Sequence, residues 1–335
     1  MISEKWLYVF NILLSRFINA LRGRPGNPHT ILCVKWDEIG DMATCTHVFS
    51  LLRKRYPEAE ITVLTKPWSA GLILFDPNVD EILTDINAWK GRYDLVLELR
   101  GTWKTLYKSI RYMPMHRMDR GWVRLRQRGA QPHETLTNYR IAEPVLNGLP
   151  NESPGLFCHD ENRKLVNDFL GKSGIQTYCV IHAGARRKLR QWPVHEFAAL
   201  ADWLYEEKGL TAVFAGTPEE EPQIREITGM MKRPYALFTN NFSLCDLMAL
   251  MERATLFVGN ESGPLQMADA LKLPLVALFG PGVPHVFYPQ NPKARVLHVL
   301  LECNPCDQVH CVHPDSPCIS RISQEQARQA ILSVL

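Results

Sequence analysis

The chain has 335 residues, of which 46% are hydrophobic and 22% charged, close to the average of soluble globular proteins. This composition excludes a disordered chain, a collagen and a multi-span membrane protein, and the length is sufficient for two ordinary domains. The 38 Lys and Arg exceed the 35 Asp and Glu by only +3, too little for nucleic-acid binding over the whole surface. We therefore expect no nucleic-acid partner and basic surface only locally.

Residues 6–21 form the one segment typical of a membrane contact. The run is apolar, but four polar residues interrupt it, and it is shorter than the roughly 20 residues that a spanning helix needs. No small-residue cleavage site follows, which argues against a secretory signal. We predict that residues 1–28 form an amphipathic helix and linker on the inner face of the cytoplasmic membrane. The alternative is a helix packed on the protein's own surface. The cations that would face anionic lipid are Lys5, Arg16, Arg22 and Arg24.

Strand and helix patterns alternate along the rest of the chain, which favours parallel sheets covered by helices. In the first half, strands are expected at residues 31–36, 60–64 and 95–99, with helical spacing over 43–55. Residues 147–155 are polar and rich in Pro and Gly, as in a domain joint. We therefore expect one domain over residues 29–155 and a second over 156–335.

The second half repeats the scheme, and each of its strands ends in a loop that contains Gly. Strands are expected at residues 178–182, 211–215, 256–258 and 275–279. Helices are expected at about 194–208, from 264 to about 271, and from 324 to the end. In open α/β sheets, ligands bind beyond the carboxyl ends of the strands.

Three of these loops carry side chains that suit a nucleotide. The turn at residues 259–264 leads into a helix, whose free N–H groups favour a phosphate, with Ser262 as an added donor. Four cations within residues 186–190 follow another strand, and acidic residues follow Gly216. Each loop has an alternative interpretation. The turn at 259–264 would be an ordinary capped loop, the cations at 186–190 a solvated surface, and the acids after Gly216 the usual preference of acidic residues for a helix N-terminus.

Asp41 joins the first strand to the first helix of the domain. One interpretation is a helix N-cap. The other is a general base that takes a proton from an attacking hydroxyl.

The chain resembles the lipopolysaccharide heptosyltransferases, glycosyltransferase family 9, over roughly residues 30–335. The markers of this resemblance are Ile39-Gly40-Asp41 with Tyr56-Pro57, Arg190-Gln191-Trp192-Pro193, Val213-Phe214-Ala215-Gly216, Asn260-Glu261-Ser262-Gly263-Pro264 and Phe279-Gly280-Pro281.

The resemblance implies a GT-B fold, with two Rossmann-like domains facing across a cleft, an acceptor-side domain first and a nucleotide-sugar-binding domain second. It implies inverting transfer of a sugar, heptose from ADP-heptose, to a lipopolysaccharide-type glycolipid, with no metal or other cofactor. The matching site residues are Asp41 as catalytic base, Lys188, Arg190, Glu261, Ser262, Gly263 and Gln266 for the donor diphosphate and sugar, and Gly216, Glu219 and Glu220 for the nucleoside.

Three positions depart from the family pattern. Arg190 replaces a Lys, which keeps the charge but changes its geometry. Glu261 stands in place of Asp, and Gln266 stands where many members have His.

A basic tract runs from residue 100 to 128, with nine cations, one acid and interleaved aromatic residues. A phosphorylated glycolipid at a membrane suits this mixture, and we predict that Arg100, Lys104 and Arg120 bind the acceptor. Nucleic acid would also suit it, and a solvated helical face is the third interpretation.

The cysteines fall into two groups. Those in apolar surroundings are expected to be reduced and buried, which favours a cytoplasmic location: Cys33, Cys45, Cys158, Cys179 and Cys245. The others cluster near the C-terminus: Cys303, Cys306, Cys311 and Cys318. Their spacing is not the paired form typical of zinc, so we expect a structural knot, either metal-bound or reduced, rather than a functional metal.

Two rival functions use the same donor pocket: a nucleotide-sugar epimerase of GT-B type and a catalytically silent, membrane-associated nucleotide-sugar-binding protein. The absence of a G-x-G-x-x-G after the first strand argues against a dehydrogenase.

Overall fold

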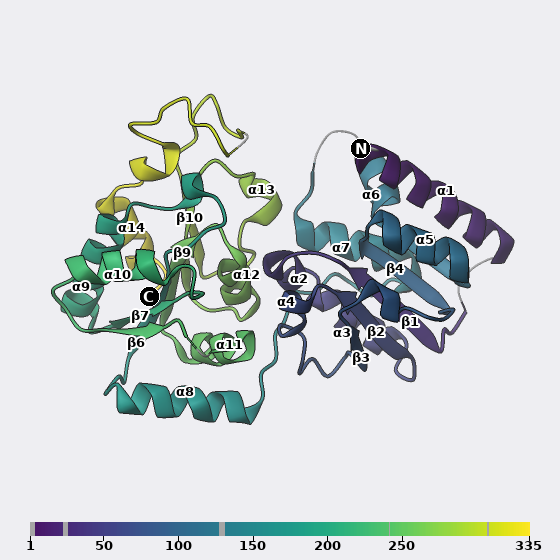
Figure 1. Cartoon of the computed structure of the whole chain (residues 1–335), viewed down its shortest axis with the longest axis horizontal. Coiled ribbons are helices and arrows are strands. Elements are labelled where there is room, and N and C mark those ends of the chain that lie inside the picture. Colours follow the sequence, from purple (N-terminus) through teal and green to yellow (C-terminus); the bar gives the residue numbers. More distant parts are fainter. Residues whose placement is uncertain (1–3, 23–25, 127–130, 241, 307) are drawn as a thin grey trace. The chain divides into compact units, whose positions relative to one another are not determined.

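The computed structural model describes the chain except for residues 1–3, 23–25, 127–130, 241 and 307. The chain divides into two compact units, Met1–Phe157 and Cys158–Leu335, each an α/β unit built on a parallel sheet (Figure 1).

The first unit contains a five-stranded parallel sheet in the order β3-β2-β1-β4-β5. Its strands are β1 (Thr30–Lys35), β2 (Glu60–Thr65), β3 (Glu81–Leu83), β4 (Leu95–Arg100) and β5 (His116–Asp119). The three predicted strands are confirmed to within a residue at each end. The sequence did not predict β3, which has three residues, or β5, which has four residues of mostly polar sequence.

The helices of the first unit are α1 (Glu4–Arg22), α2 (Ile39–Ala43), α3 (Thr46–Arg55), α4 (Pro67–Ala70), α5 (Trp103–Tyr112), α6 (Arg120–Arg126) and α7 (Glu134–Ala142), with 3-10 turns at Ile86–Ala88 and Glu143–Val145. The helix expected over residues 43–55 corresponds to α3, which begins only at Thr46, because the shorter helix α2 ends at Ala43. The hydroxyl of Thr44 donates to the carbonyl of Asp41 at 2.8 Å, and such a bond competes with helix continuation.

Helices cover both faces of the first sheet. α3 and α7 pack together, and α7 lies against β4 and β5. On the other face, Trp89 and Ile86 pack on Leu32 and Val96 of the strands, with Tyr112 of α5 against them. The predicted N-terminal helix is present as α1, which lies beside β5, α5 and α6. None of the helices in the described part of the chain is both long enough and apolar enough to cross a bilayer.

The second unit contains a six-stranded parallel sheet in the order β11-β10-β9-β6-β7-β8. Its strands are β6 (Tyr178–His182), β7 (Thr211–Ala215), β8 (Tyr235–Phe238), β9 (Leu256–Asn260), β10 (Leu275–Phe279) and β11 (Ala294–His298). The four predicted strands are confirmed, and the two unpredicted ones, β8 and β11, are the sheet edges.

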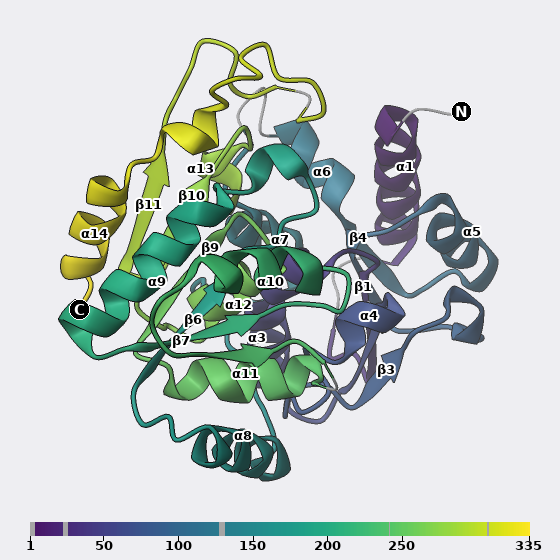
Figure 2. The same cartoon turned by 60° about the vertical axis from the view of Figure 1, so that its left-hand side comes forward.

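The helices of the second unit are α8 (Asp160–Lys172), α9 (Val194–Lys208), α10 (Glu221–Met230), α11 (Leu244–Arg253), α12 (Gly263–Ala270), α13 (Pro284–Phe287) and α14 (Gln324–Leu332), with 3-10 turns at Lys188–Arg190 and Cys318–Arg321. α9 and α14 lie on one face of the sheet, whereas α11 and α12 lie on the other (Figure 2).

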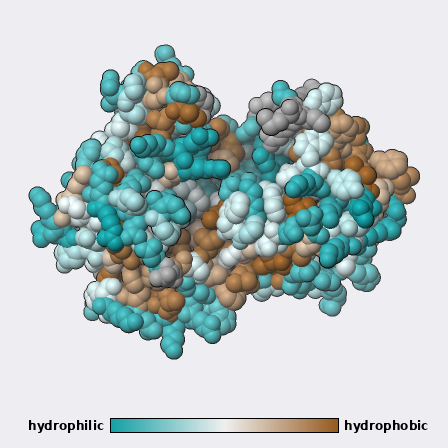
Figure 3. All heavy atoms as spheres, in the orientation of Figure 1, coloured by the Kyte–Doolittle hydropathy of each residue, from teal (hydrophilic) through white to brown (hydrophobic). Residues whose placement is uncertain are grey.

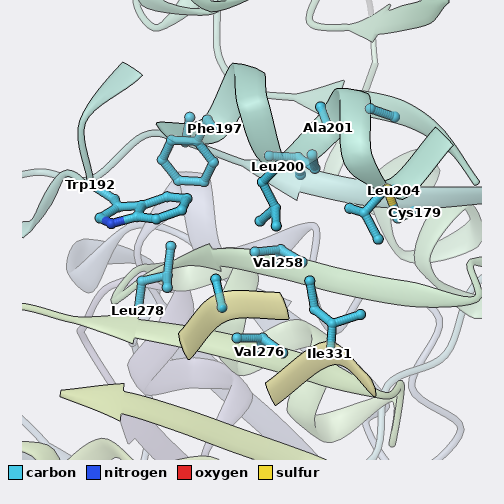
Figure 4. Close-up of a cluster of buried hydrophobic side chains, with 14 of the residues drawn as sticks. Cys179, Trp192, Phe197, Leu200, Ala201, Leu204, Val258, Val276, Leu278 and Ile331 are labelled. Atoms are coloured by element: carbon cyan, nitrogen blue, oxygen red, sulfur yellow. The ribbon is translucent and has the colours of Figure 1, made fainter. Parts of the chain in front are cut away.

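The core of the second unit fills the space between its sheet and α9 (Figure 4). Trp192 and Phe197 meet edge to face with ring centroids 5.1 Å apart, and Ile331 of α14 reaches the same cluster. This packing holds the loop before α9, including Arg190 and Gln191, at the carboxyl end of the sheet.

Candidate functional site

Each unit has a group of polar side chains at the carboxyl ends of its strands. In the first unit, β1, β4 and β5 are neighbours, so residues that follow them meet at one edge. We call Lys35, Asp37, Asp41, Arg120 and Glu134 the carboxylate cluster.

Lys35, the last residue of β1, is fully buried with its ammonium group in an ion pair. Its Nζ lies 3.2 Å from Oε1 of Glu134 and 3.8 Å from Oδ2 of Asp37. Arg120 binds the two carboxylate oxygens of Glu134 at 2.7 and 2.6 Å. Burial alone would raise the pKa of Glu134, but Lys35 and Arg120 lower it to about 2. Glu134 is therefore a fixed negative charge between two buried cations.

Asp41 lies in the first turn of α2, and the N-cap of that helix is Glu38. The interpretation of Asp41 as the N-cap is therefore wrong. Desolvation raises the pKa of Asp41 to about 7, and the charge of Asp37 adds to this, whereas Lys35 and Arg120 oppose it. A carboxylate with such a pKa can accept a proton at neutral pH and release it again.

The three residues predicted to bind the acceptor lie in different environments. Lys104 is exposed on α5, and Arg100 is partly exposed, with its Nε 3.8 Å from Asp37. Arg120 is only 5% exposed. Glu134 binds both of its terminal nitrogens, so Arg120 supports the carboxylate cluster, and its contact with the acceptor stays a prediction.

In the second unit, a hydrogen-bonded chain joins the loops that follow β9, β6 and β7. Ser262 Oγ lies 3.2 Å from Nδ1 of His182, and Nε2 of His182 lies 3.4 Å from Oε2 of Glu220. Burial opposes ionisation of Glu220, but its bonds from His182 and Thr217 lower its pKa. Glu220 is thus an anion at neutral pH, and His182 links it to Ser262.

A glycine makes room for the Glu220 carboxylate. A Cβ added at Gly184 would lie 1.8 Å from Oε1 of Glu220, so no larger residue fits there without moving the carboxylate. Gly184 therefore keeps the acid at the edge of the sheet, where it can accept from a ligand hydroxyl.

Arg190 and Glu261 form the second pair at this edge. Arg190 Nη1 lies 3.1 Å from Oε1 of Glu261, and its Nε donates to Gln308 at 2.7 Å. Burial raises the pKa of Glu261 to about 7, against the effect of Arg190. A Cβ at Gly282 would lie 2.0 Å from Glu261, so this carboxylate also needs a glycine beside it.

The loop before α12 has the features of an anion site. Ser262 is the N-cap, but its hydroxyl makes no capping bond, and Pro264 lies in the first turn as expected. N–H groups at a helix N-terminus attract phosphate oxygens. Asn260 braces this loop, because its amide donates to the carbonyl of Ala183 at 2.6 Å and accepts from the Trp192 N–H at 3.1 Å.

The remaining predicted donor residues are less uniform. Lys188 and Glu219 are exposed, and Gly216 is partly exposed. Gln266 is buried in α12, where its amide donates to the carbonyl of Phe287 at 2.8 Å. The side-chain nitrogen of Gln266 therefore binds the backbone of α13.

Sequence reasoning missed Lys35, Glu134 and His182. Lys35 and Glu134 are 99 positions apart, so no local motif connects them. A detectable signal was present at Lys35, because a cation ends a strand whose other residues are mostly apolar. His182 likewise ends a buried strand directly before the glycine loop.

The C-terminal cysteines lie in a loop that touches the Arg190 region. All nine cysteines are free thiols, and the five expected to be buried are buried. Cys306 accepts from the N–H of Gln308 at 3.3 Å, so this loop supports the side chain that binds Arg190. In the part of the chain that the structure describes, which omits Asp307, no three potential metal ligands come together.

Comparison with known proteins identifies the family of this chain. The family model described as glycosyltransferase family 9 (heptosyltransferase) matches residues 89–315. Lipopolysaccharide heptosyltransferase 3 of Escherichia coli strain K12 is 24% identical over 283 residues, which cover 74% of this chain and 81% of that protein.

Two solved structures share the fold. A family 9 glycosyltransferase from Veillonella parvula DSM 2008 has a TM-score of 0.77 at 21% identity, over 91% of this chain and 97% of that one. The E. coli ADP-heptose lps heptosyltransferase II has a TM-score of 0.72 at 20% identity, over 91% and 98%. The two α/β units are thus those of a GT-B fold, and because the family model covers well over half of its length, the chain belongs to glycosyltransferase family 9.

Proposed function

We propose that this glycosyltransferase moves a heptose from ADP-heptose to a phosphorylated, lipopolysaccharide-type glycolipid, with inversion at the sugar carbon and without a metal. The observation that carries the proposal is the family match over residues 89–315. The relatives support its details, since the curated one is a lipopolysaccharide heptosyltransferase and a solved one is titled as an ADP-heptose enzyme.

The second unit is proposed to hold the donor. The N–H groups at the start of α12, Ser262 and Gly263 would bind the diphosphate, with Arg190 and Lys188 stabilising the charge of the leaving nucleoside diphosphate. Glu220, held by His182 and Gly184, would accept from nucleoside hydroxyls, next to Gly216 and Glu219. Glu261 and Gln266 complete the proposed donor set.

Asp41 of the first unit is proposed as the base. Its carboxylate takes the proton of the acceptor hydroxyl while that oxygen bonds to the anomeric carbon. The bond between this carbon and the diphosphate oxygen breaks on the opposite face, and the electron pair leaves with the nucleoside diphosphate. Because Asp41 must be ionised, and burial raises its pKa to about 7, turnover is expected to rise with pH through about 7.

The acceptor is proposed to carry phosphate and a lipid anchor. Arg100 and Lys104 lie at the end of β4 and the start of α5, where they would contact the phosphate. The enzyme would then work on the cytoplasmic side of the inner membrane as a peripheral protein.

The test is acceptor-dependent release of nucleoside diphosphate by the purified protein. ADP-, UDP- and GDP-sugars are first compared by thermal shift, and the sugar that stabilises the protein most is then incubated with and without a core glycolipid acceptor. We expect release of ADP from ADP-heptose only when the acceptor is present. Turnover of the donor without acceptor would instead indicate an epimerase, and binding without turnover a silent binding protein.

The role of Asp41 is tested with a matched pair of variants. We expect Asp41→Asn to lose at least about 100-fold in turnover while donor binding stays within about twofold. Asp76→Asn is the control, because Asp76 is another buried carboxyl group of the same unit with a raised pKa and lies outside the carboxylate cluster. Wild-type turnover in Asp41→Asn would exclude Asp41 as the base.

A further inference from the structure

Helix α1 packs on the first unit through a partly polar face. Leu7, Asn11, Ser15 and Ile18 are buried. Arg117 of β5, which is also buried, donates to Ser15 Oγ at 2.6 Å and to the Asn11 side chain, and it pairs with Glu98. The inward face of α1 therefore provides hydrogen-bond acceptors to the buried Arg117–Glu98 ion pair. The largest apolar side chains of α1 lie on another face.

A second contact fixes the helix on the edge of the sheet. The side-chain amide of Asn19 donates to the carbonyl of Arg117 at 2.8 Å and accepts from its N–H at 3.0 Å. Asn19 thus pairs with the backbone of edge strand β5 much as a neighbouring strand would. α1 is held in one orientation by specific polar bonds.

This orientation leaves the most apolar face of α1 in solvent. Leu13, Phe17 and Leu21 are 58%, 57% and 62% exposed, and Trp6, Val9 and Phe10 lie on the same side. Figure 3 shows apolar side chains gathered along the part of the surface formed by α1. A helix that only completed the core would bury these side chains.

Helix α5 extends this apolar face. The Phe10 and Trp103 rings meet edge to face with centroids 5.8 Å apart, and Trp6 lies 6.4 Å from Phe10. Tyr107 and Ile110 of α5 are 58% and 52% exposed. We define the α1–α5 surface by its exposed apolar residues: Trp6, Val9, Phe10, Leu13, Phe17, Leu21, Trp103, Tyr107 and Ile110.

The exposed charged residues of α1 after Glu4, and those of α5, are cations. Lys5 and Arg16 of α1 and Lys104 and Arg111 of α5 are exposed, and neither helix contains an acidic residue after Glu4. Tryptophan and tyrosine favour the level of lipid headgroups, and nearby Lys and Arg favour anionic ones.

We propose that the α1–α5 surface docks on an anionic lipid bilayer as a preformed platform, with α1 lying in the headgroup layer and α5 beside it. The proposal rests on the proposed function in that it assigns to two helices the membrane contact required by a lipid-anchored acceptor. The charges disfavour a second copy of this chain as the occupant, because an isologous contact would bring like charges together.

The test is co-sedimentation of the full chain with vesicles, without donor or acceptor, so that its outcome is independent of catalysis. We expect binding to vesicles of phosphatidylethanolamine and phosphatidylglycerol, and much weaker binding to phosphatidylcholine alone. The triple variant Leu13→Ser/Phe17→Ser/Leu21→Ser, and separately Tyr107→Ser/Ile110→Ser, should each lower the partition coefficient by about tenfold or more. Lys5→Gln/Arg16→Gln/Arg111→Gln should reduce binding to anionic vesicles and its dependence on salt.

The matched control is Leu165→Ser/Met230→Ser/Leu332→Ser, which removes three exposed apolar side chains from the second unit and should bind like the wild type. Circular dichroism of each variant checks that the chain is folded. The proposal is overturned if the wild type does not bind anionic vesicles, or if the α1 triple variant binds as well as the wild type. It is also overturned if sedimentation shows a dimer that the α1 variant dissociates, since the occupant would then be a second copy.

Discussion

The carboxylate cluster shifts the pKa values of two carboxyl groups in opposite directions, upward for Asp41 and downward for Glu134. Glu134 lies between Lys35 and Arg120, so its pKa falls to about 2. For Asp41, desolvation and the repulsion of Asp37 outweigh the effect of the same two cations, so its pKa rises to about 7. Two carboxyl groups whose pKa values differ in this way are typical of a site that needs one fixed charge and one proton acceptor.

The raised pKa of Asp41 predicts that the ionised residue destabilises the fold. Between its ordinary value of 3.8 and about 7, the folded state binds a proton that the unfolded state has lost, so the free energy of unfolding falls as pH rises. Asp41→Asn should therefore stabilise the protein by about 1–3 kcal/mol at pH 8, after allowance for its partial exposure.

The measurement is urea unfolding of wild type and Asp41→Asn from pH 4 to 8. We expect the difference to be small near pH 4, to grow up to about pH 7 and to stay constant above. A difference that does not depend on pH would mean that packing of the amide, and not ionisation of the carboxyl group, causes it.

Glu134→Gln should have the opposite effect on stability. It leaves Arg120 buried without its anion and Lys35 with only the more distant Asp37, which costs about 3–5 kcal/mol. Because the pKa of Glu134 is depressed from 4.5 to about 2, the stability that it contributes is complete above pH 4.5 and is lost as pH falls towards 2.

The comparison is with Glu152→Gln, which breaks the exposed pair with Lys54 and should cost less than about 1 kcal/mol. Chemical denaturation at pH 7 measures both. Equal losses for the two variants would contradict the buried-pair interpretation of Glu134.

Motifs predicted the residues that lie next to a recognisable turn. Asp41, Ser262 and Arg190 follow strands that the sequence defined well, and the structure places each of them at the carboxyl edge of its sheet. Lys35, Glu134 and His182 were missed because their partners are far away in sequence. The burial of Arg120 against Glu134 was not predicted for the same reason, since the two residues are 14 positions apart.

At the scale of elements, the sequence predicted central strands well and edge strands poorly. β1, β6 and β10 are buried on both faces, so their apolar runs are continuous. β3, β5, β8 and β11 lie at sheet edges and have short or mixed sequences, so no clear periodicity identifies them. The N-terminal helix was predicted from its apolar face, but its polar face against Arg117 was not.

The Asn19 contact with β5 gives a prediction at this scale. Asn19→Ala removes both bonds to the Arg117 backbone, so we expect a loss of about 1–2 kcal/mol and faster hydrogen exchange at the Arg117 amide. Asn167→Ala on α8 is the control, because Asn167 bonds only the exposed Arg253 side chain in the described contacts. Unchanged exchange at Arg117 in Asn19→Ala would show that the edge of β5 does not depend on this side chain.

At the scale of the molecule, the alternation of strands and helices was sufficient to predict two α/β units. Each has its own parallel sheet and its own core. The proposed function divides the chemistry in the same way, with the donor groups around Ser262 and Arg190 in the second unit and the base in the first. A ligand that lacks the sugar and the acceptor should therefore act on one unit.

ADP tests this division of labour. At a concentration of 100 Kd, ADP should stabilise the unit that binds it by about 2.7 kcal/mol. We expect hydrogen exchange to slow at the amides of residues 259–263, at the end of β9 and the turn after it, and at 182–184, at the end of β6 and the loop after it, because bound phosphate and ribose hold these segments. The amides of β1 should keep their rates, since the core of the first unit is separate.

Arg190→Met should weaken the protection by removing a cation from the diphosphate, whereas Arg233→Met, which breaks only an exposed pair with Glu206, should leave it intact. Protection confined to residues 36–42 would place the nucleotide in the first unit and reverse the proposed assignment of donor and base.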